Sequence, residues 1–208
     1  MCRKLIALVL AAVMVFTVSL ALAKTVEPED PEIEKLAGTT VHATVGEYNE
    51  FLGTLTVTVF EADRFEKEDI ERLAAGDILL AGGRAYTVKE MTTAPDGEPM
   101  ALTDDGSEII FDEAGDDEMT ARSSDDDRQY MHAVNELYLK AAEGIVYEDD
   151  SNPDLDAETI VTEGLEEILK VMAEKEETSI GFHFYSTTVT LNEKLEIVKI
   201  HQVFDVAQ

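Results

Sequence analysis

Residues 73–88 read LAAGDILLAGGRAYTV. Two runs of strand-forming residues, Ile78–Ala81 and Ala85–Met91, flank the pair Gly82-Gly83, and a turn-forming segment, Ala75-Gly76-Asp77, comes before them. Glycine reaches positive φ without steric cost, which suits the tight turn between two antiparallel strands. The stretch therefore predicts a β-hairpin that the chain enters through a turn.

This strand–turn–strand pattern resembles the one found in small SH3-like or OB-like barrels of many bacterial proteins. The resemblance concerns the backbone pattern, because its glycines set turns and none of its residues forms a recognisable site. It implies a small barrel, and it implies no activity, since barrels of this kind carry many unrelated functions.

Two strands and a short helix are expected before the hairpin. Thr40–Val45 is a short run of strand-forming residues. Leu52–Phe60 alternates aliphatic residues with threonines, which is typical of a strand. Asp63 or Glu66 is expected to cap a short helix that continues through Leu73.

A second hairpin and a further strand pair are expected after it. Ala101–Asp104 and Ser107–Phe111 flank the turn-forming pair Asp105-Gly106. Gln129–Leu139 alternates as a strand does, although helical spacing is also present in it. The strand is favoured because Ile145–Tyr147 can then form its return strand.

The C-terminal part predicts one helix and one hairpin. Thr162 suits the N-cap of a helix that runs to about Glu176. Ile180–Leu191 and Leu195–Val206 are expected to form a long hairpin around the turn Asn192-Glu193-Lys194. One apolar stripe of the helix has the spacing i, i+3, i+4 and i+7, namely Leu165, Ile168, Leu169 and Met172.

The expected fold class is α+β, mainly antiparallel β, with a small SH3/OB-like barrel followed by a helix and a C-terminal β-hairpin. Residues 38–208 would form this β-rich globular region. Its division into a barrel at 38–113 and a helix–hairpin part at 114–208 is an alternative.

Residues 1–23 have the features of a secretory signal peptide. Arg3 and Lys4 precede the uncharged apolar run Leu5–Leu20, and Ala21-Leu22-Ala23 is a small-x-small cleavage site. We therefore expect a secreted or extracellular protein with no stable membrane span after cleavage. An uncleaved N-terminal membrane anchor is the alternative, because the apolar run is nearly long enough to cross a bilayer.

The chain left by such cleavage would begin at Lys24. Because two of the 23 removed residues are basic, it would have 185 residues and a formal charge of −31. Residues 24–37 would form an acidic, flexible spacer. The single cysteine, Cys2, would be lost, which excludes disulfides, thiol catalysis and Cys-ligated metal sites.

The charge of the whole chain limits its partners. It has 16 basic and 45 acidic residues and a formal net charge of −29. A protein with this much negative charge repels phosphate backbones. The charge therefore excludes nucleic acid as a partner. The apolar share of 45% suits a globular core and argues against global disorder.

No motif for nucleophilic catalysis, nucleotide binding or helix-borne zinc occurs in the sequence. Two histidines give one weak metal hypothesis. A turn that pairs Leu191 with Leu195 would make His183 and His201 diagonal neighbours on one face of the terminal hairpin. A register change of one residue would separate them. Two half-exposed strand histidines are the alternative interpretation.

Acidic residues are dense in two stretches. Asp104–Asp127 contains eleven acids and one base, Arg122, and Glu148–Asp156 contains five more acids. Such oxygen ligands suit Ca²⁺, although Ala157 replaces the glycine that an EF-hand loop needs. A solvated surface is the other interpretation. The candidate Ca²⁺ ligands are Asp116, Asp117, Asp125, Asp126, Asp127, Asp149, Asp150, Asp154 and Asp156.

Together these observations predict an exported, acidic, non-enzymatic module of bacterial type that binds or scaffolds an unknown extracellular protein or small ligand. The alternatives are a Ca²⁺-modulated surface protein, a secreted inhibitor-like domain that uses the C-terminal helix and hairpin, and a carboxylate-based hydrolase. No catalytic residue is assigned, and no cofactor is expected apart from weakly bound Ca²⁺.

Overall fold

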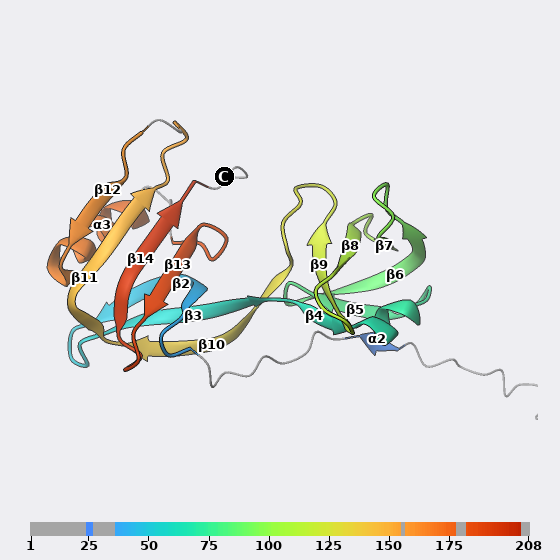
Figure 1. Ribbon diagram of the computed structural model, residues 1–208, viewed down its shortest axis with the longest axis horizontal. Helices are drawn as coiled ribbons and strands as arrows, with labels where there is room; N and C mark the ends of the chain where they lie inside the picture. The colour runs from blue at the N-terminus through green and yellow to red at the C-terminus, as the bar shows by residue number, and fades with distance from the viewer. Residues whose placement is uncertain (1–23, 27–35, 155–156, 178–181, 205–208) are drawn as a thin grey trace, which may run out of the picture.

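The protein consists of two lobes, shown in Figure 1 for the computed structural model. The structure describes residues 24–26, 36–154, 157–177 and 182–204. Each lobe is built on one seven-stranded sheet. Most neighbouring strands are antiparallel and helices are few, which confirms the expected α+β class with mainly antiparallel pairing.

The outer lobe contains the sheet with the order β10-β3-β2-β13-β14-β11-β12. Helix α3 (Leu165–Glu177) packs on one face of this sheet. Only the pair of β11 and β14 is parallel among its described pairings. The strands are β2 (Thr40–Asn49), β3 (Thr54–Ala62), β10 (Met131–Leu139), β11 (Ala141–Asp150), β12 (Ile160–Glu163), β13 (Thr187–Leu191) and β14 (Ile197–Val203).

The core of the outer lobe follows the alternation in β3. Leu55, Val57 and Val59 are fully buried, whereas the threonines between them are partly exposed. Ile168 and Met172 of the predicted apolar stripe reach the same core from α3. Because a strand has a period of two and a helix a period of 3.6, each element presents one apolar face to the same interior.

The predicted N-cap of α3 is wrong. Thr162 lies in β12, where it faces Tyr147 of β11 in an antiparallel ladder. The chain turns from strand to helix at Gly164, whose φ is +86°. That positive φ is open to glycine at little cost, so the helix starts at Leu165.

The inserted lobe comprises residues 63–130 together with β1, and its sheet has the order β1-β5-β6-β7-β8-β9-β4. The predicted glycine turn is confirmed, since Gly82 and Gly83 both have positive φ between β5 and β6. Its elements are β1 (Thr25–Val26), β4 (Arg64–Glu66), α2 (Lys67–Glu71), β5 (Ile78–Ala81), β6 (Arg84–Thr93), β7 (Pro99–Thr103), β8 (Glu108–Glu113) and β9 (Glu118–Ser123).

The chain enters and leaves this lobe at one place. Ala62 at the end of β3 is the partner of Met131 at the start of β10, and these strands are antiparallel neighbours in the outer sheet. The lobe is thus inserted into the connection of a strand pair (Figure 1). The expected division after residue 113 differs from this arrangement, because β2 and β3 belong to the outer sheet.

Contacts of Asp63 and Tyr185 bind the two lobes together where the chain crosses between them. Asp63 is completely buried, and its carboxylate contacts Nδ1 of His132 at 2.5 Å and accepts the Gly82 N–H at 2.5 Å. Within the inserted lobe, Tyr130 packs edge-to-face on Tyr86 at a centroid distance of 5.9 Å. The hydroxyl of Tyr185 donates to the Gln129 carbonyl at 3.0 Å.

Three further predictions differ from the structure. Ile145–Tyr147 lies in β11, which pairs with β12 and β14 and not with β10. Thr188 is the partner of His201, and His183 precedes β13, so the two histidines are not diagonal neighbours. Asp63 does not cap a helix. Instead of pairing with β10, β11 lies at the other end of the sheet, between β14 and β12.

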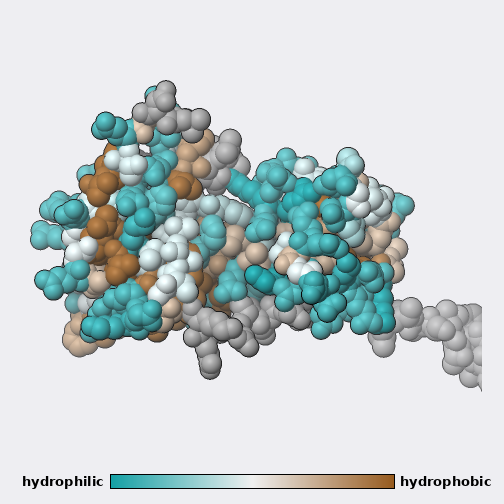
Figure 2. All heavy atoms as spheres, in the orientation of Figure 1, coloured by the Kyte–Doolittle hydropathy of each residue, from teal (hydrophilic) through white to brown (hydrophobic). Residues whose placement is uncertain are grey.

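Apolar exposure is uneven between the lobes. In the view of Figure 2, hydrophobic residues gather on the outer lobe, and the inserted lobe is covered mainly by hydrophilic ones. Among the described residues, all large apolar side chains that are exposed belong to the outer lobe: Phe51, Leu52, Tyr138, Ile160, Val161, Leu195, Val203 and Phe204. A surface that recognises a partner is therefore more plausible on that lobe.

Candidate functional site

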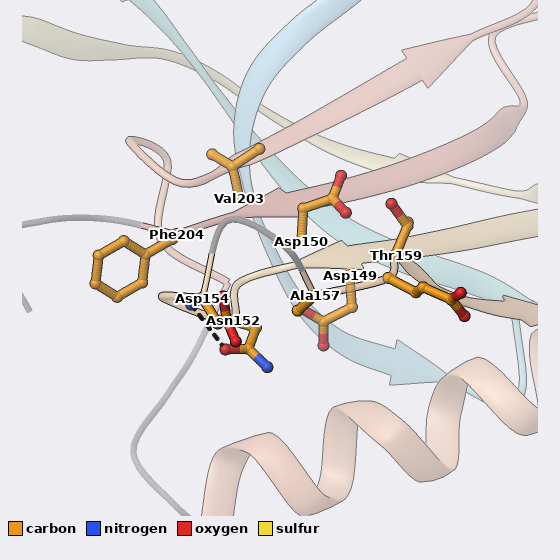
Figure 3. Close-up of a pocket in the computed structure, with 9 residues that line it drawn as sticks. Asp149, Asp150, Asn152, Asp154, Ala157, Thr159, Val203 and Phe204 are labelled. Carbon is orange, nitrogen blue, oxygen red and sulfur yellow. Dashed lines mark hydrogen bonds between the residues drawn. The ribbon is translucent and has the colours of Figure 1, made fainter.

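A hollow of about 510 Å³ opens at the ends of β11 and β14 on the outer lobe. It coincides with the second acidic stretch of the sequence. Figure 3 shows that its wall combines carboxylates from the end of β11 and the following segment with Val203 and the ring of Phe204. The lining residues are Asp149, Asp150, Asn152, Asp154, Ala157, Glu158, Thr159, Val203 and Phe204.

The strand pair β11 and β14 positions the first two acids. Asp149 and Asp150 are the last residues of β11, and they point to opposite sides (Figure 3). Asp150 is the register partner of Val203, and the Phe204 N–H donates to the Asp150 carbonyl at 3.1 Å. The parallel ladder thus places an acid of one strand beside the apolar end of the other.

Asp149 faces helix α3 and is strongly held there. Its Oδ2 lies 2.9 Å from Nζ of Lys175, and its Oδ1 accepts the Ser151 N–H at 2.9 Å. Burial by itself raises the pKa of Asp149, but hydrogen bonds from Ser151 and Lys175 outweigh it and hold that pKa at about 2. This carboxylate is therefore a fixed anion that anchors the floor of the hollow to α3.

Asp150 faces the solvent side of the sheet. Its Oδ2 lies 2.8 Å from Nε2 of His201, and two residues earlier on β11 Glu148 lies 2.8 Å from Nζ of Lys199. Hydrogen bonds from the Thr159 hydroxyl and from His201 lower the pKa of Asp150. One cross-strand ion pair and one cross-strand contact between a carboxylate and an imidazole therefore run along this edge of the hollow.

The segment after β11 forms the remaining acidic wall. The Asp154 N–H donates to Oδ1 of Asn152 at 3.0 Å, and the Ala157 N–H donates to the Asp154 carbonyl at 2.9 Å. Val203 and Phe204, which are 39% and 43% exposed, line the same hollow. The hollow therefore offers a negative wall and an apolar wall to one ligand.

The structure does not bring the predicted Ca²⁺ ligands together. Asp116, Asp117 and Asp125–Asp127 lie on the inserted lobe, whereas Asp149, Asp150 and Asp154 lie on the outer lobe. Within the described ranges no three His, Cys, Asp or Glu side chains are arranged to hold a metal ion. Asp156 lies outside the described residues, and Ca²⁺ binding stays a prediction.

Arg122 binds acidic residues of the first acidic stretch. Its guanidinium contacts Asp112 at 2.8 Å, Asp96 at 2.7 Å and Asp127 at 2.6 Å. The hydrogen bond and ion pair with Asp112 contribute most to raising the pKa of Arg122, so it remains charged. One base thus holds an acid of strand β8 and two acids from separate loops, which is a structural arrangement.

The sequence did not predict the buried contact between Asp63 and His132, and it did not predict that Phe204 lines the hollow. Asp63 was expected to cap a helix, because acids are common at that position. Its burial depends on Gly82 and Tyr130, which come from other elements. No local signal in the sequence identifies such a contact.

The comparisons with known proteins give no relatives. No protein-family model matches the chain, and no curated protein and no solved structure is detectably similar to it. Among the described residues no helix combines the length and apolar character needed to cross a membrane. The site must therefore be interpreted from its own chemistry.

Proposed function

We propose that the protein is an exported, non-enzymatic binding module, and that the hollow on its outer lobe binds a basic peptide segment. One observation carries the ligand class: the apolar side chains of Val203 and Phe204 line the same hollow as the acidic residues Asp154 and Glu158. A segment that alternates arginine or lysine with an apolar residue complements both walls.

The charge of the chain supports the same ligand class. A formal net charge of −29 attracts cations over a long range and accelerates their encounter. Arginine also stacks on aromatic rings, so Phe204 suits a guanidinium as well as an apolar side chain.

Binding is favoured over catalysis by the state of the carboxylates. Asp149 and Asp150 are both held ionised by partners, so neither has the raised pKa that a general acid requires. The export part of the proposal is supported by the sequence features of residues 1–23. We also propose that the curled sheet of the inserted lobe is a variant of the small SH3/OB-like barrels, with a supporting role.

A direct test is fluorescence anisotropy with a labelled hexapeptide of alternating arginine and phenylalanine. The matched probe replaces each arginine with glutamate. We expect the basic peptide to bind and the acidic one not to bind. Phe204→Ser and Asp154→Asn should each weaken binding about 5- to 10-fold, which corresponds to the loss of about 1 kcal/mol.

Phe51→Ser is the control, because Phe51 is 96% exposed in the β2–β3 turn, at the other end of the outer lobe (Figure 1). It should leave binding unchanged. Equal weakening by all three variants would show that the hollow is not the site. Robust turnover of a broad panel of hydrolase substrates by the purified protein would refute the non-enzymatic part.

A further inference from the structure

The residue that follows the expected cleavage site is held firmly by the inserted lobe. The main-chain nitrogen of Lys24 donates to Oδ1 of Asp77 at 2.8 Å, and the Ile78 N–H donates to the Lys24 carbonyl at 2.7 Å. Two residues later Val26 is only 1% exposed and belongs to the core of the lobe. The segment expected to be a spacer therefore begins as strand β1, paired in parallel with β5.

Asp77 is itself fixed in position. Its Oδ2 accepts the Ala74 N–H at 3.0 Å, and its own N–H donates to the Ala74 carbonyl at 3.1 Å. The Val88 N–H donates to the Asp77 carbonyl at 2.9 Å. The carboxylate that meets Lys24 is thus part of a rigid turn and cannot follow a displaced chain.

A second carboxylate meets the side chain of the same residue. Nζ of Lys24 forms an ion pair with Asp69 of α2. Both nitrogens of Lys24 therefore face an acid, one at the main chain and one at the side chain. The buried Val26 fixes the register in which this happens.

We propose that a leader endopeptidase hydrolyses the Ala23–Lys24 bond, and that Asp77 is the binding site for the new N-terminal ammonium group of Lys24. Water adds across the peptide bond, so Ala23 leaves with a carboxylate and Lys24 retains a protonated amino group. A neutral N–H donor beside Asp77 becomes a cation, and a charge-assisted hydrogen bond is stronger than a neutral one.

The consequence is that cleavage stabilises the fold at one particular residue. A chain that begins one or more residues earlier keeps the N–H donor but carries no charge beside Asp77. A chain that begins later loses the contact. The inference rests on the export part of the proposed function and is independent of the ligand.

The first measurement is the intact mass of protein secreted from a bacterial host that expresses the full chain. We expect a mass that corresponds to a start at Lys24. Protein that stays in the cells with its leader attached would overturn both the cleavage and the export proposal, whereas secreted protein with a different start would overturn only the assigned cleavage site.

The second measurement compares two purified proteins by thermal unfolding at low salt. One begins at Lys24, released from a removable fusion that leaves no extra residue, and the other retains Gly-Ser before Lys24. The first should melt about 2–4 °C higher, the shift expected for about 1 kcal/mol in a chain of this size.

In the Asp77→Asn background this difference should disappear. Asp69→Asn is the matched control, since it removes the side-chain ion pair and should lower both melting temperatures while leaving their difference. Equal melting of the two forms in the unmodified background, or a difference that persists in Asp77→Asn, would refute the binding site while leaving the cleavage itself intact.

Discussion

Asp63 and His132 join the two lobes at the point where the chain crosses between them, with Oδ1 of the acid 2.5 Å from Nδ1 of the imidazole. Asp63 directly follows β3, and His132 is the second residue of β10. The carboxylate also accepts the N–H of Gly82, which lies in the turn of the β5–β6 hairpin. The pair therefore connects both sheets through one buried anion.

Loss of this anion should destabilise the protein. Asp63→Ala leaves the Gly82 N–H and the imidazole without their buried partner, so we expect the free energy of unfolding to fall by about 2–3 kcal/mol. Asp63→Asn, which keeps an acceptor for Gly82, should cost less. Urea unfolding measures both, with the exposed Asp104→Ala as control. If Asp63→Ala lowered the free energy of unfolding no more than the control does, the stabilising role of Asp63 would be contradicted.

Acid should selectively remove the contribution of Asp149. Its pKa of about 2 lies below its usual 3.8, so its stabilisation is complete above pH 4 to 5 and disappears as the pH falls towards 2. The wild type should exceed Asp149→Asn by about 2 kcal/mol near pH 6 and by almost nothing near pH 2. Urea unfolding at several pH values gives this difference, and a constant difference would show that ionisation of Asp149 is not the cause.

Arg122 should contribute more to the free energy of unfolding than an ordinary basic residue on the surface does. Arg122→Met leaves Asp96, Asp112 and Asp127 without their shared cation, and we expect a loss of about 1–2 kcal/mol in the free energy of unfolding. Arg122→Lys should restore little, because a single ammonium cannot match the fork of a guanidinium. Thermal unfolding would compare them with Arg72→Met.

Arg72 provides the matched control because its ion pair among the described residues is the exposed one with Glu68 in α2. Exposed pairs of this kind contribute at most about 1 kcal/mol. If Arg122→Met and Arg72→Met lowered the melting temperature equally, the contacts of Arg122 with three acids would stabilise the protein no more than one exposed ion pair does.

Calcium should act on this protein mainly as a salt. Because no three ligands converge within the described ranges, we expect CaCl₂ and MgCl₂ at equal millimolar concentration to raise the melting temperature equally. A larger shift with Ca²⁺ would reveal native-state binding by mass action and restore the Ca²⁺-modulated alternative.

The inserted lobe should be removable. Since Ala62 and Met131 are register partners, a two-residue Asn-Gly loop in place of residues 63–130 should close β3 and β10 into a direct hairpin. Circular dichroism and cooperative unfolding should then report a folded outer lobe. Replacing residues 63–131 with the same loop shifts the register by one and should prevent folding, because it reverses the faces of β10.

The sequence predicts the pairing of neighbouring strands in this fold better than the pairing of distant ones. Gly82-Gly83 and Asp105-Gly106 each specify a turn locally, and both hairpins are confirmed. The pairing of β10 with β3 could not be predicted, because it joins segments separated by a whole lobe. The register of β13 and β14 was also missed, since it is set by an irregularity next to Leu191 and not by turn length alone.

The candidate site shows the same limit. Composition indicates the acidic stretch that lines the hollow, because charge is visible in the sequence. The partners of those acids were not visible. Lys175 comes from α3 and His201 from β14, and only the parallel pairing of β11 with β14 brings them to the same place.

The position of the inserted lobe also determines the order in which the chain can fold. In an unfolded chain, pairing β3 with β10 requires closure of a long loop, and the entropy lost on closure opposes it. Once the inserted lobe has folded, its two ends already lie together, as the hydrogen bond from the Asp63 N–H to the Tyr130 carbonyl shows. The inserted lobe thereby brings the two strands within reach, so we expect β10 to pair with β3 after this lobe has folded.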